Sequence, residues 1–143
     1  SKRALFLAII DHVGDRMIDV LATATGGLTD GQAQVEAGTI AFFKWVERDK
    51  NAFKVLFDSG TRNDDEFTIA IRRVLDRSAE AIAPLITINS NPIHLRTLAH
   101  AVAGASEGVA RFLINNDVAF DGEKTGKQIA NLLWAGLRGV DAE

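Results

Sequence analysis

Residues 99–112 read AHAVAGASEGVARF, a run dominated by small side chains inside a longer stretch of helical character. Asn91 and Pro92 provide a strong start signal for this helix, because asparagine caps helices and proline is favoured at the first helical position. Each glycine within a helix costs roughly 1 kcal/mol relative to alanine. Gly104 and Gly108 therefore predict a close approach of another helix, from this chain or from a second subunit, rather than a catalytic site.

A helical wheel at about 100° per residue separates this helix into three faces. One face is aliphatic and is expected to meet the core; it holds Leu95, Leu98, Ala99, Val102, Val109 and Leu113. A second face, which we call the small face, holds Thr97, Ala101, Gly104, Ala105, Gly108 and Phe112. The polar third includes Glu107 and Arg111, spaced as a favourable intrahelical ion pair. That pair is expected at the surface or rim, the alternative being contact with a ligand or partner.

The composition indicates one all-helical domain covering residues 1–143. Apolar residues make up 47% of the chain and charged residues 24%, with two prolines and no cysteine. Disulfides and thiolate metal sites are thus excluded, and a reducing cytoplasm is a compatible location. No apolar run reaches the roughly 18 residues that span a membrane. A net charge of −3 with scattered basic residues argues against direct binding of DNA phosphates by this chain.

Six helices are expected, with no internal repeat. The first covers about residues 2–24, the second begins after Thr29, and the third covers about 51–57. Asn63 is expected to cap the fourth, Pro92 opens the fifth, and Asp121 or Gly122 opens the sixth, which ends near residues 138–139. Thr29 with Gln32, and Asn63 with Glu66, have the spacing of capping boxes. Buried residues on both sides of the second helix predict a central position for it.

No catalytic arrangement is present in the sequence. His12, His94 and His100 form no H-x-x-x-H or H-E-x-x-H pair that would place two metal ligands on one helix face. Phosphate-binding loops, dinucleotide fingerprints and nucleophile elbows are also missing. We therefore expect no metal, no cofactor and no enzymatic activity, with a small helical enzyme as the weakest alternative.

Two hydroxyl side chains interrupt apolar stripes, Thr39 in the second helix and Ser78 in the fourth. Each hydroxyl could bond back to a carbonyl one turn earlier, which would make it purely structural. Alternatively, both could face a mostly apolar cavity with a few polar groups, the usual composition of a small-molecule pocket. Aromatic residues are dense near both positions. The sequence leaves the two interpretations open.

Three segments resemble the TetR family of transcriptional regulators. LLWAGLRG at residues 132–139 is similar to the closing helix of many members, and HAVAGASEGVARF at 100–112 is similar to the preceding helix. SKRALF at 1–6 resembles the junction between the family's DNA-binding helix-turn-helix and its first regulatory helix. The resemblance implies the all-α effector-binding and dimerisation domain of a repressor, with a helix-turn-helix module that would precede Ser1 and bind DNA.

The resemblance also implies a homodimer in which the last two helices of each subunit form a four-helix bundle. The residues assigned to that interface are Thr97, Ala101, Gly104, Ala105, Gly108, Phe112, Ile129, Leu132, Leu133 and Gly136. A pocket for a small apolar or amphipathic effector is implied too, and wheel positions in the second to fourth helices assign residues to it. They are Thr39, Phe42, Trp45, Val46, Phe57, Phe67, Ile71, Val74 and Ser78.

Two further hypotheses follow. Leu5, Leu7 and Ile18 fall outside the main apolar stripe of the first helix, so they could dock on the preceding DNA-binding module. The hypothesis fails if Leu5 and Leu7 are buried within this domain alone. The alternative function is a helical dimerisation or protein-interaction module that binds no small molecule.

Overall fold

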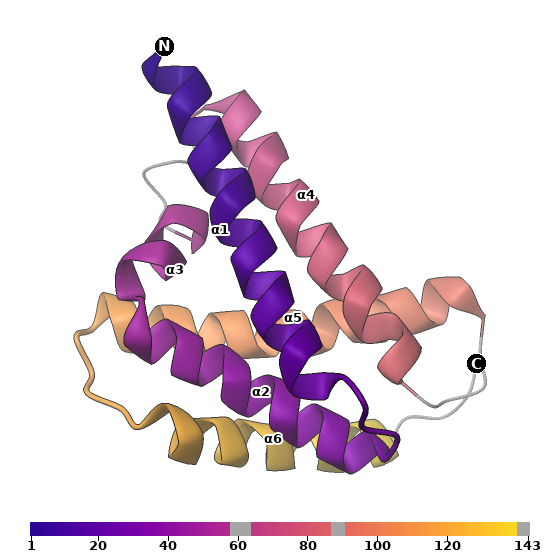
Figure 1. Cartoon of the computed structure of the whole chain (residues 1–143). Helices are drawn as coiled ribbons and strands as arrows, with labels where there is room; N and C mark the ends of the chain where they lie inside the picture. The colour runs from indigo at the N-terminus through magenta and orange to yellow at the C-terminus, as the bar shows by residue number, and fades with distance from the viewer. Residues whose placement is uncertain (58–63, 87–90, 140–143) are drawn as a thin grey trace.

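The computed structural model describes residues 1–57, 64–86 and 91–139, and its regular elements are all helical (Figure 1). This confirms the predicted all-α class. The elements are α1 (Lys2–Thr25), α2 (Gly31–Arg48), α3 (Lys50–Phe57), α4 (Asp65–Ile82), the 3₁₀ helix η2 (Ala83–Leu85), α5 (Pro92–Asn115) and α6 (Gly122–Arg138).

Side-chain caps fix where the helices begin. Asn91 accepts a hydrogen bond from the backbone N–H of His94 at 2.9 Å, which confirms the predicted start of α5. Two predicted caps are wrong by one residue. Asp30, rather than Thr29, caps α2, and Asp64 caps α4 in place of Asn63, which lies outside the described residues. In both cases an aspartate follows the predicted cap, and its carboxylate accepts the free N–H groups of the first turn.

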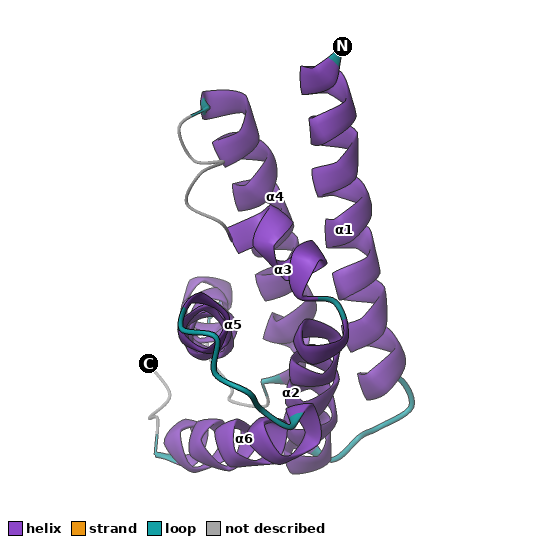
Figure 2. Ribbon diagram, turned by 90° about the vertical axis from the view of Figure 1, so that its left-hand side faces the viewer, coloured by secondary structure: helices purple, strands orange, loops and turns teal. Residues whose placement is uncertain are grey.

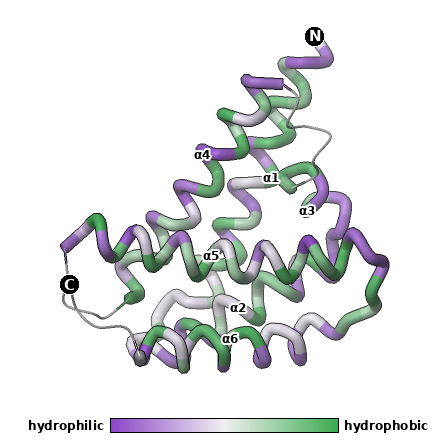
Figure 3. Tube along the Cα trace, turned by 180° about the vertical axis from the view of Figure 1, so that it is seen from behind, coloured by the Kyte–Doolittle hydropathy of each residue, from purple (hydrophilic) through white to green (hydrophobic). Residues whose placement is uncertain are grey.

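The helices form two regions, shown from perpendicular directions in Figures 1 and 2. α1 and α4 run side by side and project toward the N-terminus, whereas α2 and α6 pack together at the opposite end. Seen from behind, α5 crosses the molecule above α6 (Figure 3). α2 packs against α1, α3, α5 and α6, which confirms its predicted central position.

α6 docks closely on α2 at two glycines. A Cβ atom at Gly126 would lie 2.5 Å from the Cα atom of Ile40, and one at Gly122 would lie 2.8 Å from the Cα atom of Lys44. The N–H of Gly122 also donates to Glu47 Oε1 at 3.0 Å, placing a carboxylate at the positive end of the α6 dipole. α2 and α6 therefore approach each other closely at both glycines.

The small face of α5 makes no such approach within the chain. Ideal Cβ atoms at Gly104 and Gly108 would meet no atom within 4 Å. The inner side of α5 is instead a narrow ridge of buried residues, and of the predicted aliphatic face only Ala99 is fully buried. The ridge consists of Ala99, Ser106, Ala110 and Ile114.

The hydrophobic core lies where α1, α2, α3 and α4 meet. Its largest completely buried side chains are Phe43, Phe53, Ile10, Leu56, Val46 and Val74. Gly14 of α1 allows close packing there, since a Cβ atom at this position would lie 2.5 Å from Val74 Cγ2. No helix among the described segments is long and apolar enough to cross a membrane.

Candidate effector cavity

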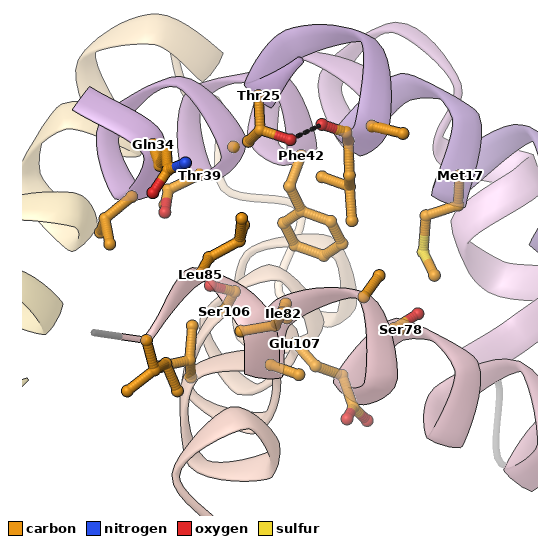
Figure 4. A pocket seen from close by; sticks show the side chains of 18 of the residues that line it. Met17, Thr25, Gln34, Thr39, Phe42, Ser78, Ile82, Leu85, Ser106 and Glu107 are labelled. Carbon is orange, nitrogen blue, oxygen red and sulfur yellow. Dashed lines mark hydrogen bonds between the residues drawn. The ribbon is translucent and has the colours of Figure 1, made fainter. Parts of the chain in front are cut away.

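A cavity of about 610 Å³ lies between the helices, at the level where α1 ends and α5 crosses (Figure 4). Its wall includes residues of α1, α2, α4, η2, α5 and α6, together with Phe57 of α3. Most lining side chains are aliphatic or aromatic, and the volume falls in the range of pockets that hold small organic ligands. The arrangement suits binding of an apolar molecule.

The residues assigned to a pocket from the sequence divide into two groups. Thr39, Phe42, Phe57 and Ser78 line the cavity. The others lie outside its lining because their wheel positions point into the packed core or toward the N-terminal end of α4. This second group consists of Trp45, Val46, Ile71 and Val74, all buried in the core, and Phe67, whose ring lies 4.7 Å from that of Phe6.

Hydroxyl groups in the cavity wall differ in their hydrogen bonding. Ser78 Oγ donates to the carbonyl of Val74 at 3.1 Å, and Thr25 Oγ1 donates to that of Leu21 at 2.9 Å, the bond drawn in Figure 4. Ser78 therefore both bonds back to a carbonyl one turn earlier in α4 and lines the cavity. Thr39 and Ser106 have no hydrogen-bond partner in the described part of the chain.

Charged groups are rare in the cavity wall. Within the described lining, the charged side chains are Glu107 and Arg138. The Glu107 carboxylate accepts a hydrogen bond from Arg111, one turn further along α5, so the predicted ion pair forms. It lies at the rim of the cavity, with Glu107 mostly buried and Arg111 more exposed.

Sequence reasoning missed the α1, α5 and α6 walls. Met17 belonged to a recognisable apolar stripe, and Trp134 stood in the closing motif, yet neither pattern distinguishes a side chain that packs from one that borders empty space. The lining residues that the sequence did not assign to a pocket include Met17, Leu21, Thr25, Gln34, Ala103, Ser106 and Arg138. For Glu107, which also lines the cavity, contact with a ligand was the alternative to a surface ion pair.

The residues assigned to a dimer interface lie mostly on an uncovered surface. All six small-face residues are exposed, with Phe112 at 60%. On α6, Leu132 is 66% exposed and Gly136 is exposed, while Ile129 and Leu133 are half-buried. On the wheel, the small face lies opposite the buried ridge of α5, so it is available to a partner.

The N-terminal ends of α1 and α4 are joined by polar and aromatic contacts. Arg3 Nη2 lies 2.6 Å from Asp64 Oδ2, and the Arg3 guanidinium also lies 5.4 Å from the centre of the Phe67 ring. The hydrogen bond from Arg3 holds the pKa of the Asp64 carboxyl below its ordinary value, assisted by the backbone N–H groups of the first turn of α4. Beside this junction, Leu5 is 63% exposed, whereas Leu7 is half-buried against the core.

The described residues contain no group of three or more His, Asp or Glu side chains that could hold a metal ion. The cavity, with its apolar wall, is therefore the best-formed candidate site in the described structure.

Comparison with known proteins identifies relatives of the same fold. The chain is 23% identical over 142 residues to the HTH-type transcriptional activator FasR of Mycolicibacterium smegmatis, covering 98% of this chain and 65% of the relative. It also matches the crystal structure of a TetR-like transcriptional regulator from Rhodococcus sp. RHA1, with a TM-score of 0.76 and 25% identity. That match covers 98% of this chain and 74% of the other. No family model matches the chain.

The described structure thus combines an all-helical fold, an apolar cavity and an uncovered small-residue face. In its fold, and over 98% of its length, the chain is similar to TetR-like transcriptional regulators.

Proposed function

We propose that residues 1–143 form a single effector-binding and dimerisation domain of a TetR-like regulator. In this proposal the domain binds a small apolar or amphipathic molecule in the cavity and pairs with a second copy. Binding then controls a DNA-binding helix-turn-helix module that precedes this domain in the whole protein. The cytoplasm is the corresponding location.

The cavity is the observation that carries the effector proposal. Protein interiors are normally close-packed, and voids larger than a few water molecules are uncommon. An apolar space of about 610 Å³ between α2, α4 and α5 is therefore a notable feature, and its size suits a small organic molecule. A ligand that fills the space removes the apolar wall from water.

The uncovered faces of α5 and α6 support the dimer proposal. Phe112 and Leu132 expose large apolar side chains, and the neighbouring positions Gly104 and Gly108 allow another helix to come close. Association of two such surfaces would bury apolar area that is otherwise in water. Pairing of α5 and α6 with the same helices of a second copy would complete a four-helix bundle.

Transmission from the cavity to the N-terminus would follow α1. Met17, Leu21 and Thr25 in the second half of α1 line the cavity, while Arg3 lies at its other end. A helix of 24 residues is about 36 Å long. A ligand that binds one placement of α1 better than another shifts the population toward it and so changes the spacing of the two DNA-binding modules.

The exposed Leu5 supports docking of the preceding module on the first turns of α1. Leu7 offers less surface for such docking, because it is half-buried against the core. Repression is the direction of control that the sequence resemblance implies. FasR, an activator by name, represents the opposite direction. An operator-binding assay with and without ligand, on a protein that carries the module, separates the two directions.

Titration with N-phenyl-1-naphthylamine, a fluorophore that brightens in apolar surroundings, tests the proposed function. We expect saturable binding to the parent domain, and a loss of at least about tenfold in affinity for Ala103→Phe, whose ring occupies the cavity. Ala8→Phe introduces the same ring at an exposed position of α1 and is expected to bind as the parent does.

The second candidate function, a dimerisation module without a small-molecule ligand, makes a different prediction. The fluorophore would then not bind, or would bind Ala103→Phe and the parent equally. Either result would refute effector binding in this cavity while leaving the dimer proposal intact.

A further inference from the structure

Two polar side chains in the cavity wall are buried without a partner. Thr39 is 7% exposed and Ser106 is 8% exposed, and both line the cavity. Figure 4 shows them on facing walls, Thr39 on α2 and Ser106 on α5. Neither hydroxyl has a hydrogen-bond partner among the residues that the structure describes. Neither oxygen is among the fully enclosed unpartnered atoms of the described residues, so both hydroxyls open onto the cavity, where a ligand can complete their hydrogen bonds.

The other cavity hydroxyls have different hydrogen-bonding capacity. Ser78 and Thr25 already donate their hydrogens to backbone carbonyls, so only their lone pairs remain available. The hydrogens of Thr39 and Ser106 are uncommitted. The amide nitrogen of Gln34 is also engaged, donating to the carbonyl of Leu28 at 2.7 Å. Two free donors thus face each other across an apolar space, a pattern that matches a hydrogen-bond acceptor.

The surrounding charges favour an acceptor without a charge. Glu107 follows Ser106 directly and lines the same wall, and its carboxylate is compensated by Arg111. An anionic group held by Ser106 would lie near that carboxylate. The cation of the described lining, Arg138, belongs to α6 rather than to the walls that carry the two hydroxyls.

We propose that Thr39 and Ser106 together bind an uncharged acceptor oxygen, such as a ketone, ester or amide carbonyl, on an otherwise apolar ligand. The inference rests on the proposed function and specifies the chemistry of its effector. The hydroxyls select the carbonyl-bearing molecule, and the aliphatic and aromatic wall holds its apolar part.

Three ten-carbon probes that compete with N-phenyl-1-naphthylamine test the proposal: butylbenzene, butyrophenone and 4-phenylbutyrate. All three carry an aromatic ring. Butylbenzene has no polar group, butyrophenone has a ketone and 4-phenylbutyrate has a carboxylate. We compare the parent with the double variant Thr39→Val/Ser106→Ala. The butyrophenone-to-butylbenzene affinity ratio should fall about tenfold in the variant, as expected for lost hydrogen bonds in an apolar site. Thr23→Val removes a hydroxyl at an exposed position of α1 outside the cavity lining, so it is the control and should keep the parent's ratio.

Infrared spectroscopy of butyrophenone labelled with ¹³C at the carbonyl provides a readout independent of affinity. The carbonyl stretch should lie at lower frequency in the parent than in the double variant. An unchanged ratio and an unchanged stretch would overturn the proposal, as would tighter binding of 4-phenylbutyrate than of butyrophenone. If butylbenzene and the fluorophore also fail to bind the parent, the proposed effector function fails with it, so the two failures are distinguishable.

Discussion

Gly126 of α6 lies so close to Ile40 of α2 that a Cβ atom at the glycine would be 2.5 Å from the Ile40 Cα atom. A backbone atom moves much less readily than the end of a side chain, so this contact restricts the position to glycine. Together with the hydrogen bond from Gly122 to Glu47, it fixes α6 against the central helix.

Gly126→Ala should therefore destabilise the protein. Although alanine favours the helix by roughly 1 kcal/mol, separation of α6 from α2 should outweigh this gain, giving a net loss of about 1–3 kcal/mol in the free energy of unfolding. Urea denaturation followed by circular dichroism measures the change.

Gly104→Ala provides the matched control, because the same substitution there meets no atom within 4 Å. At protein concentrations low enough for a monomer, it should raise stability by up to about 1 kcal/mol through helix propensity alone. Equal effects at positions 104 and 126 would contradict the packing described for α6.

Bulky residues on the small face should weaken association of subunits. Gly104→Leu and Gly108→Leu place side chains where the proposed bundle needs close helix approach, while in the isolated subunit both positions are open. We expect a dimer for the parent and at least about a tenfold weaker dimer for each variant, measured by analytical ultracentrifugation. A monomeric parent at tens of micromolar would refute the interface assignment.

The Arg3–Asp64 contact should make stability depend on pH in the acidic range. The pKa of Asp64 is lower in the folded protein than its ordinary value of 3.8, so its contribution is fully present above that value and is lost as the pH falls through the folded pKa. Asp64→Asn preserves a capping side chain but removes the charge, so the parent should exceed it in stability at neutral pH.

The difference between parent and Asp64→Asn should shrink as the pH falls below about 4. Arg3 remains charged throughout this range, because its own pKa is raised above an already high value. Chemical denaturation at several pH values measures the difference. A difference that stays constant down to the most acidic condition would show that the Asp64 charge does not stabilise the fold.

Much of the fold follows from local sequence signals. Asn91–Pro92 and Asp121 begin helices because a capping oxygen and a preset proline backbone act within a few residues. The errors at Thr29 and Asn63 arose where an aspartate stood next to a reasonable cap, and the choice between them depends on where the first helical turn is held by packing. Those errors move the starts by one residue without changing the order of helices.

The cavity was less predictable, because it depends on how deeply helices interpenetrate. A wheel places Val74 and Ser78 on one face of α4, yet Val74 packs against Gly14 while Ser78 borders the cavity one turn later. Similarly, Gly104 and Gly126 are both helical glycines, but only the second meets another helix within the chain. Such differences arise from three-dimensional packing, which the spacing of residue types does not encode.

Native mass spectrometry of the parent domain with N-phenyl-1-naphthylamine tests the central claim most directly, since one spectrum reports both subunit number and bound ligand. The account predicts a homodimer that carries one fluorophore per subunit, and an Ala103→Phe dimer that carries none. A monomeric parent would contradict the account. A parent that takes up no fluorophore, just as Ala103→Phe does, would also contradict it.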